Sequence, residues 1–509
     1  MSFDIAFDNA VGITMDPAYP RANTIMVDKG YIVSVGNEKG VSPTHARRII
    51  DCTKGTLLPG LNDAHIHLLS YANSLHSLDC SHRTVRSIAD LQKALFAKAE
   101  STPWGQWIRG VGYDEFYLNE KRHPTRHDLD RVLKDHPVRL DHRSSHACVL
   151  NSHALEKIGI SSDSPDPHGG VIIRDSSGHP TGLLLEMNRY VSERMPRVTE
   201  ETLANSINEV SKQLLSWGIT SIQDATPACG VEKWKTISRL AKSGNLRQRL
   251  VFMPGIEYVE EFVSQGLHYK SGGHNIRIGP VKLMVTCTSG SISPSINDIR
   301  ELVHRAHKAG YPVAIHAVEE DVILAVSRIL VEDSMTDNIL RPDRIEHCSE
   351  ATPRVIRQIV DAGVSVVSQP SFIFESSQRY QSEVPLNLQK SLYPFKSLIE
   401  AGIPLAAGSD APVASPNPWQ ALYAAVTRKN VSDQPFHPEQ NLLLEEAINL
   451  WTSNAAFVAG EQQSFGSLKP GMFADIVLLD RDITRCSPEE LLNVKVRIVV
   501  IGGEIVWES

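Results

Sequence analysis

The chain has 509 residues, of which 41% are hydrophobic and 22% charged, and its formal net charge is -8. This balance is that of an ordinary globular protein, and the length suggests about three domain-sized units. The acidic net charge argues against nucleic-acid and anionic-membrane binding, since both need a basic surface.

Segments that would direct the chain to a membrane or an oxidising compartment are not found. No apolar run approaches a membrane span, and the first residues lack the basic start and apolar core of a signal peptide. The seven cysteines are scattered and form no Cys-x-x-Cys, which argues against a disulfide framework or a cysteine zinc cage. We therefore predict a cytoplasmic protein with reduced thiols.

Both ends of the chain have the pattern of short β-strands. Residues 22–35 and residues 496–507 each read as a hairpin with glycine in the turn. Neither end is long enough to close its own core. We predict one small β-sandwich domain built from residues 1–56 and 460–509, with the rest of the chain inserted between them.

The stretch from Leu57 to His67 combines an apolar approach, a Pro-Gly break and a buried strand that ends in His-x-His. Side chains two residues apart leave the same face of a strand, so His65 and His67 should point together. Two neutral imidazoles held in this way can bind zinc or a similar metal. The alternative is two polar residues at a strand end, with no metal.

Residues 70–195 are rich in Ser, His, Pro and Gly and show few long helical repeats. We predict an inserted subdomain that covers the active site, because a segment this long is usually functional if it is ordered. It contains the aromatic residues Trp104, Trp107, Tyr113, Phe116 and Tyr117. These either form the subdomain's own core or contact an apolar or aryl substrate.

From about residue 196 the sequence alternates between helical segments, glycines and apolar strands. The predicted strands cover residues 61–67, 219–224, 249–254, 280–285, 312–316, 344–347, 364–369 and 403–410. The helices predicted between them include residues 200–217, 231–243, 297–309, 352–362 and 392–401.

This repeat is typical of a parallel sheet with helical crossovers. Eight such units predict a closed (β/α)8 barrel of the TIM type, formed by residues 57–69 and 196–459. An open doubly wound sheet is the alternative, but no Gly-x-Gly-x-x-Gly turn follows a strand.

Residues suited to metal binding stand at the ends of five predicted strands. They are His65 and His67 on the first, Lys282 on the fourth, His316 on the fifth, His347 on the sixth and Asp410 on the eighth. Each could be an ordinary polar residue, but barrel active sites lie at these strand ends. Lys282 interrupts an apolar strand, where a buried ammonium must find a partner or lose its charge. The six residues together predict one site.

The order His-x-His, Lys, His, His, Asp resembles the amidohydrolase superfamily. The wider match is to amidohydrolase family 3, the group that includes N-substituted formamide deformylases. The stretches that carry the resemblance are residues 60–67, 107–114, 146–155, 281–282, 313–317, 344–347 and 408–412. With the terminal β domain, the resemblance covers essentially the whole chain.

The resemblance implies two divalent metal ions, usually zinc, in one binuclear site. It implies that His65, His67 and Asp410 hold one ion and that His316 and His347 hold the other. Lys282 would be carboxylated, and its carbamate would bridge both ions. A metal-activated hydroxide would then attack the substrate, with Asp410 as general base and acid.

Two loops depart from the family's pattern. Residues 286–290 read Thr-Cys-Thr-Ser-Gly in place of the usual Asp-Gly, and residues 316–320 lack the usual Gly-Asp after the histidine. Neither change removes a predicted ligand, so the departures affect the prediction of substrate identity more than the prediction of metal binding. His146 resembles a family position that reaches into the site, and it is either a substrate contact or a structural polar residue.

These patterns predict a hydrolase of carbon–nitrogen bonds other than peptide bonds, acting on a small organic molecule. Three alternatives stay open: decarboxylation, ester hydrolysis or deamination at the same metal site. A further alternative is a catalytically inactive binding protein. We expect a small-molecule substrate, no nucleic acid and no membrane as partners, and a homodimer is compatible with the sequence.

Overall fold

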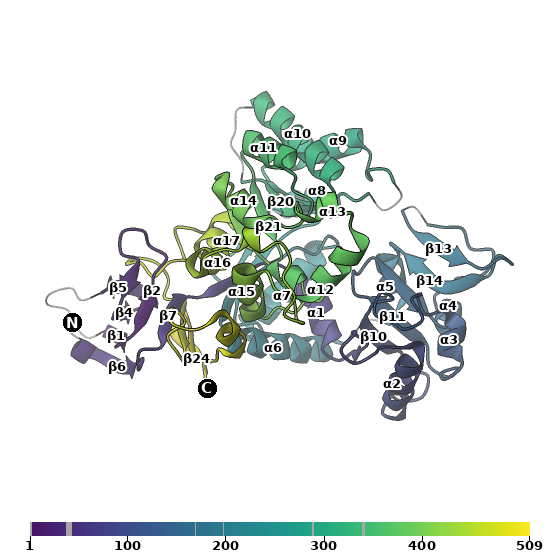
Figure 1. Cartoon of the computed structure of the whole chain (residues 1–509), viewed down its shortest axis with the longest axis horizontal. Coiled ribbons are helices and arrows are strands. Elements are labelled where there is room, and N and C mark those ends of the chain that lie inside the picture. The colour runs from purple at the N-terminus through teal and green to yellow at the C-terminus, as the bar shows by residue number, and fades with distance from the viewer. Residues whose placement is uncertain (1–2, 37–42, 168, 197, 288–289, 338–341) are drawn as a thin grey trace. The chain divides into compact units, whose positions relative to one another are not determined.

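The computed structural model describes residues 3–36, 43–167, 169–196, 198–287, 290–337 and 342–509. The chain divides into two compact units, one formed by Met1–Leu68 with Ile207–Ser509 and the other by Leu69–Ser206 (Figure 1). The fold is mixed α/β. The domain boundaries predicted from the sequence, at residues 56, 69, 195 and 459, stay predictions.

In the first unit, strands from both chain ends build two sheets. One sheet has the order β5 (Tyr31–Val35), β4 (Ile25–Asp28), β1 (Phe3–Asp8), β6 (Ala46–Asp51). The other has the order β25 (Glu504–Glu508), β24 (Val496–Ile501), β23 (Ile476–Leu479), β7 (Thr56–Pro59), β2 (Val11–Ile13), β3 (Arg21–Ala22). Figure 1 shows the purple β7 beside the yellow strands of the C-terminus, where it pairs with β23. Apolar side chains such as Phe7, Val27 and Leu478 form one core shared by both sheets.

Two parallel sheets make up the centre of the same unit. One has the order β17 (Ile276–Ile278), β16 (Arg249–Phe252), β15 (Ile219–Asp224), β8 (Leu61–Ile66). The other has the order β18 (Val281–Met284), β19 (Val313–Ala317), β20 (Arg344–His347), β21 (Ser365–Ser368), β22 (Leu405–Ala407). Their residues are almost all buried, as expected for parallel strands covered on both faces.

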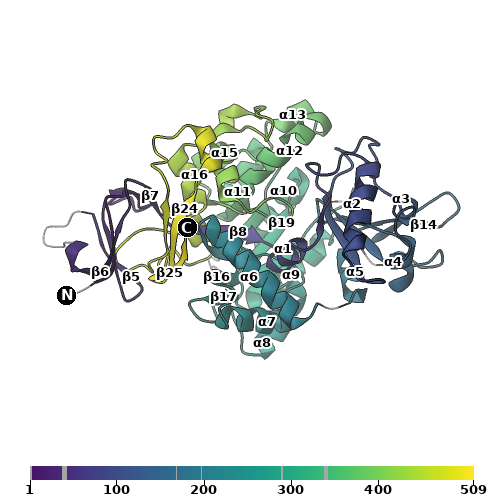
Figure 2. The same cartoon turned by 90° about the horizontal axis from the view of Figure 1, so that it is seen from below.

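Helices of this unit lie around the parallel strands (Figure 2). They are α6 (Glu200–Ser216), α7 (Val231–Lys242), α8 (Val259–Ser264), α9 (Ile296–Lys308), α10 (Glu320–Asp337), α11 (Pro353–Ala362), α12 (Pro370–Glu383), α13 (Leu386–Gln389), α14 (Phe395–Glu400), α15 (Pro418–Thr427), α16 (Leu444–Leu450) and α17 (Ser453–Val458). Short 3-10 turns occupy η1 (Pro43–His45), η2 (Ile256–Tyr258), η3 (Pro438–Gln440) and η4 (Pro488–Asn493).

Local sequence sets where these helices begin and end. The hydroxyl of Thr352 accepts a hydrogen bond from the Val355 N–H at the start of α11, and Pro353 occupies its first turn. Gly363 ends that helix with a φ of 64°, a conformation that costs glycine little. Within the described ranges, no helix combines the length and apolar content needed to cross a bilayer.

The second unit is built on one mixed sheet. Its order is β13 (Val171–Arg174), β14 (Pro180–Leu185), β12 (Ala147–Leu150), β11 (Val138–His142), β10 (Ile108–Tyr113), β9 (Leu78–Asp79). Helices α1 (Leu68–Ser74), α2 (Ile88–Glu100), α3 (Arg126–Asp130), α4 (Ser152–Lys157) and α5 (Asn188–Arg194) accompany it.

The aromatic residues of this unit have different environments. Tyr113 is fully buried in an apolar core, and Trp107 packs partly buried against a second core. Trp104 is 81% exposed. The core interpretation therefore holds for Tyr113 and Trp107 but not for Trp104.

Candidate metal centre

The predicted ligands lie where parallel strands of the first unit end. His65 is near the end of β8 and His67 directly follows it, Lys282 is on β18, His316 on β19, His347 on β20, and Asp410 follows β22. Neighbouring parallel strands end on the same side of a sheet, which is why residues distant in sequence meet here.

His65, His67 and Asp410 form the tightest group. The Asp410 Oδ1 atom lies 2.9 Å from His67 Nε2 and 3.4 Å from His65 Nε2. One ligand atom from each of the three residues lies within 4.8 Å of the others. The three side chains can therefore reach one point in space.

The remaining histidines continue this group. The ring centroid of His347 lies 4.8 Å from that of His65 and 4.5 Å from that of His316. Lys282 is 1% exposed, and its charge helps to lower the pKa values of His65 and His347. The structure thus brings the six predicted ligands to one region of the unit.

The backbone at the site is held by hydrogen bonds between strand ends. The Asp410 N–H donates to the His65 carbonyl at 2.7 Å, and the His67 N–H donates to the Ala411 carbonyl at 2.9 Å. His347 and Asp410 have φ values of 70° and 59°. Such left-handed conformations are uncommon outside glycine and are concentrated at functional sites.

Burial dominates the electrostatics of the site. It lowers the pKa of Lys282 from 10.5 to about 8, although Glu346 and Asp410 partly oppose this shift. Burial also lowers the pKa of His65 well below 6.5, so this ring is neutral and can offer a lone pair. Burial alone would raise the pKa of Asp410, but contact with His67 and the charges of His65 and His347 hold it below 3.8.

The Nδ1 atoms of three of these histidines contact residues that were not predicted from the sequence. His65 Nδ1 contacts one carboxylate oxygen of Glu346, and Arg344 Nε donates to the other at 2.6 Å. His67 Nδ1 lies 3.2 Å from the Thr226 hydroxyl. His347 Nδ1 lies 2.9 Å from Gln369 Oε1.

Two observations show that the residues suit a divalent metal. Within the described part of the chain, His65 Nε2 and Asp410 Oδ1 are buried and make no hydrogen bond. Two ligands at about 2.1 Å from one zinc ion lie roughly 3.0–3.4 Å apart at angles between 90° and 109°. The contacts of Asp410 with the two histidines are close to this separation. Imidazole nitrogens and carboxylate oxygens are also the donors that zinc accepts.

His146 belongs to the second unit, where its Nδ1 atom lies 2.9 Å from a carboxylate oxygen of Glu186. Its side chain is 39% exposed. Its role as a substrate contact stays a prediction. Residues 288–289, in one of the two departing loops, lie outside the described residues.

The second unit has another group of ligand-type residues, formed by Asp114, Glu115 and His142. His142 Nε2 lies 2.8 Å from Glu115 Oε2, and the Ser144 N–H donates to His142 Nδ1. A neutral ring that accepts at Nδ1 carries its hydrogen at Nε2. The Ser144 contact therefore leaves the ring hydrogen on Nε2, which makes no hydrogen bond within the described residues, so His142 offers no lone pair to a metal and we assign the group to an ion-pair cluster.

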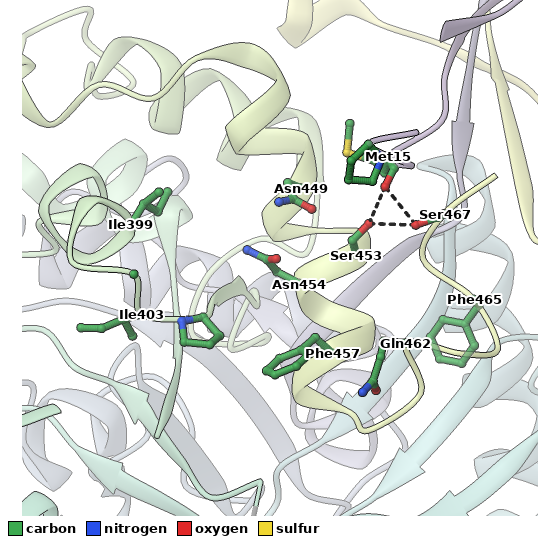
Figure 3. A pocket seen from close by; sticks show the side chains of 13 residues that line it. Met15, Ile399, Ile403, Asn449, Ser453, Asn454, Phe457, Gln462, Phe465 and Ser467 are labelled. Atoms are coloured by element: carbon green, nitrogen blue, oxygen red, sulfur yellow. Dashed lines mark hydrogen bonds between the residues drawn. The ribbon is translucent and has the colours of Figure 1, made fainter. Parts of the chain in front are cut away.

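A cavity of about 540 Å³ lies elsewhere in the first unit, beside residues 402–404, which precede β22. Figure 3 shows hydrogen bonds that join Ser453, Ser467 and the carbonyl of Met15 at its edge. None of the residues that line it is acidic, basic or a cysteine. The cavity therefore offers neither metal ligands nor acid–base groups.

Comparison with known proteins places the chain among related sequences and structures. The sequence pattern of the family described as "Amidohydrolase family" matches residues 48–507. The N-substituted formamide deformylase of Arthrobacter pascens is 28% identical, with 99% of this chain and 98% of the relative aligned. The putative amidohydrolase YtcJ of Bacillus subtilis (strain 168) is also 28% identical, with 96% of each chain aligned.

Solved structures share the fold. An uncharacterised metal-dependent hydrolase from Pyrococcus horikoshii OT3 superposes with a TM-score of 0.76 and 23% identity, covering 95% of this chain and 99% of the other. Atrazine chlorohydrolase TrzN from Arthrobacter aurescens TC1, solved with zinc, superposes with a TM-score of 0.57 and 16% identity, covering 99% and 95%.

Proposed function

Because the chain belongs to the amidohydrolase family, we propose that it is a metal-dependent hydrolase that cleaves a carbon–nitrogen bond of a small organic amide. The family match also confirms the resemblance predicted from the sequence. The observation that carries the proposal is the convergence of His65, His67 and Asp410, whose ligand atoms lie within 4.8 Å of one another.

We also propose that the two parallel sheets belong to one closed (β/α)8 barrel. Backbone hydrogen bonds join their neighbouring edges: Asp410 N to His65 O at 2.7 Å, and Lys282 N to Pro254 O at 2.8 Å. In a closed barrel all the strand ends share one rim, which is where the predicted ligands stand.

In the proposed site, His65, His67 and Asp410 would hold one divalent metal, and His316 and His347 would hold a second. Lys282, buried beside them, would supply a further anionic ligand once its neutral amine adds carbon dioxide and releases a proton. Metals bound there would supply Lewis-acid polarisation of a substrate carbonyl and would lower the pKa of water to about 7. Zinc is the metal we expect, by analogy with the TrzN structure.

The protein's own groups would orient the reactants and move the proton. Asp410 is ionised, because its pKa is held below 3.8, so its carboxylate can accept the proton of the attacking water. It can then return that proton to the nitrogen that leaves as the amide bond breaks. The hydrogen bonds between β8 and the segment after β22 keep Asp410 fixed relative to His65 during both transfers.

The first test is metal content and amide hydrolysis by the purified full chain. N-substituted formamides are the first substrates to examine, because the Arthrobacter pascens relative is named for them. We expect about two zinc-like ions per chain, activity that is lost with a chelator, and restoration by zinc. Product masses separate addition of water across an amide from loss of carbon dioxide or release of ammonia.

Substitutions at the site provide the specific test. Lys282→Ala and Asp410→Asn should each reduce kcat/KM by at least about 100-fold, because each removes a proposed ligand. Lys235→Ala, which changes an exposed lysine on α7, is the matched control and should keep full activity. Full amide hydrolysis by metal-free protein, or by Lys282→Ala, would contradict the proposal.

A further inference from the structure

Both ring nitrogens of His67 have a polar neighbour. On one side, Nδ1 forms a hydrogen bond of 3.2 Å with the Thr226 hydroxyl, just after β15. On the other side, Nε2 lies 2.9 Å from Asp410 Oδ1. A neutral imidazole has one N–H, so only one of these two contacts can receive a hydrogen from the ring. The direction of the Thr226 contact decides which nitrogen carries it.

The hydroxyl of Thr226 can act only as an acceptor toward His67. Its oxygen lies 2.6 Å from Asp224 Oδ1, which also accepts the Thr226 N–H at 3.1 Å. A hydroxyl has one hydrogen, and here that hydrogen is donated to the carboxylate. Only lone pairs remain for His67, so Nδ1 must supply the hydrogen and Nε2 keeps its lone pair.

Asp224 fixes this arrangement firmly. Its side chain is fully buried, on the last residue of β15, and both of its hydrogen bonds come from Thr226. The hydroxyl consequently has little freedom to rotate. A neighbouring histidine follows the same rule, because the Glu346 carboxylate can only accept a hydrogen from His65 Nδ1.

We propose that Thr226, held by Asp224, is a positioning residue that sets the tautomer and orientation of His67, so that Nε2 offers a lone pair to the metal. This inference rests on the proposed function, which supplies the metal ion that Nε2 would bind. Without the hydroxyl, Nδ1 loses its acceptor while Asp410 still lies 2.9 Å from Nε2, so the hydrogen should move to Nε2. There it would block the metal. Loss of a residue that orients a metal-binding histidine typically costs 10–100-fold in metal affinity.

Three variants of the full chain test the proposal. Thr226→Val keeps the shape of the side chain but removes the acceptor, and Thr226→Ser keeps the hydroxyl. Thr236→Val makes the same change on α7, where the hydroxyl donates to the Glu232 carbonyl. Zinc affinity is measured by competition with a chelator. We expect about 10–100-fold weaker zinc binding for Thr226→Val, and values within about threefold of wild type for the other two.

A second measurement does not depend on metal. Nitrogen-15 NMR of histidine-labelled, metal-free protein reports which ring nitrogen carries the hydrogen, and the His67 signal is identified by its absence in His67→Gln. We expect hydrogen on Nδ1 in wild type and Thr226→Ser, and on Nε2 in Thr226→Val. If Thr226→Val does not fold, Thr226→Ala and the wild-type spectrum answer the same question.

The outcomes separate the two proposals. Wild-type protein that binds no zinc would contradict the proposed function, while the NMR result would still decide the role of Thr226. Wild-type His67 with its hydrogen on Nε2 would overturn the inference. Thr226→Val that binds zinc as tightly as wild type would overturn it as well.

Discussion

At the residue scale, the position of His65 depends on a glycine opposite it. A Cβ atom added to Gly408 would lie 2.5 Å from both the Cβ atom and the backbone nitrogen of His65. Protein interiors are closely packed and cannot absorb such a contact without moving the backbone. Gly408 therefore allows the end of β22 to approach β8 closely enough for Asp410 to reach His65.

We expect Gly408→Ala to move these strand ends apart. Overpacking should lower the free energy of unfolding by about 1–3 kcal/mol. Zinc affinity should fall by at least about tenfold, because the ligands are displaced. Gly273→Ala is the control, since an added Cβ there meets no atom within 4 Å. Chelator competition and urea unfolding compare the two variants, and equal zinc affinity in both would show that the close approach does not matter.

The sequence predicts six candidate ligands, which the structure brings to one region, but not the residues that hold them in place. The ligands are visible because histidine, lysine and aspartate interrupt apolar strands at their ends. Arg344 and Glu346 could have been noticed, since a base and an acid two residues apart in a buried strand indicate an internal ion pair. Thr226 carries no such signal. Its role arises because β15 pairs with β8, which brings the segment after β15 close to His67. The sequence does not show that these two strands are neighbours.

At the element scale, helices with one buried stripe are predicted from the sequence, and helices with a run of consecutive buried residues are not. The segments predicted at residues 231–243, 297–309 and 352–362 match α7, α9 and α11 within two residues at each end. Helices α12 and α15 are missed. Residues 370–374 of α12 and residues 421–425 of α15 are continuously buried, so neither helix has the periodic apolar stripe that identifies a surface helix. Strand β17 has only three residues and is missed for lack of length.

Helix α3 of the second unit illustrates how a short element is stabilised. Thr125 and Asp128 form a capping box, in which the Thr125 N–H donates to Asp128 at 2.8 Å. Arg122 donates to the same carboxylate at 2.7 Å. Burial raises the pKa of Asp128, but Arg122 and Thr125 outweigh it and lower the pKa from 3.8 to about 2.

We expect Asp128→Asn to remove stability that depends on pH. A carboxyl with a lowered folded-state pKa stabilises the fold above its unfolded pKa of 3.8, and the contribution is lost as the pH falls toward 2. The shift corresponds to about 2 kcal/mol at neutral pH. Urea unfolding at pH 7, 5 and 3.5 should therefore show a gap between wild type and variant that narrows below pH 4. A gap of constant size would mean that the charge of Asp128 is not responsible.

At the scale of the whole first unit, strands from the two chain ends are joined to the parallel strands by a buried ion pair. Arg249 on β16 donates two hydrogen bonds, of 2.6 and 3.0 Å, to Asp475, which directly precedes β23. Their side chains are 7% and 3% exposed. Asp475 also accepts the Gly502 N–H in the C-terminal hairpin. The sequence predicts that both ends share one β domain, but not this pair, because its members are 226 residues apart.

We expect Asp475→Asn to destabilise the first unit by about 3 kcal/mol, because it leaves the buried Arg249 guanidinium without a compensating charge. The same kind of change at an exposed pair should cost far less. Glu508→Gln removes the carboxylate that Arg48 contacts at 2.7 Å, but both side chains are about half exposed, at 49% and 54%. Exposed ion pairs contribute about 0–1 kcal/mol. Urea unfolding followed by tryptophan fluorescence measures both variants against wild type. If both substitutions cost equally little, the Arg249–Asp475 pair does not secure the terminal strands to β16, and the shared apolar core alone must do so.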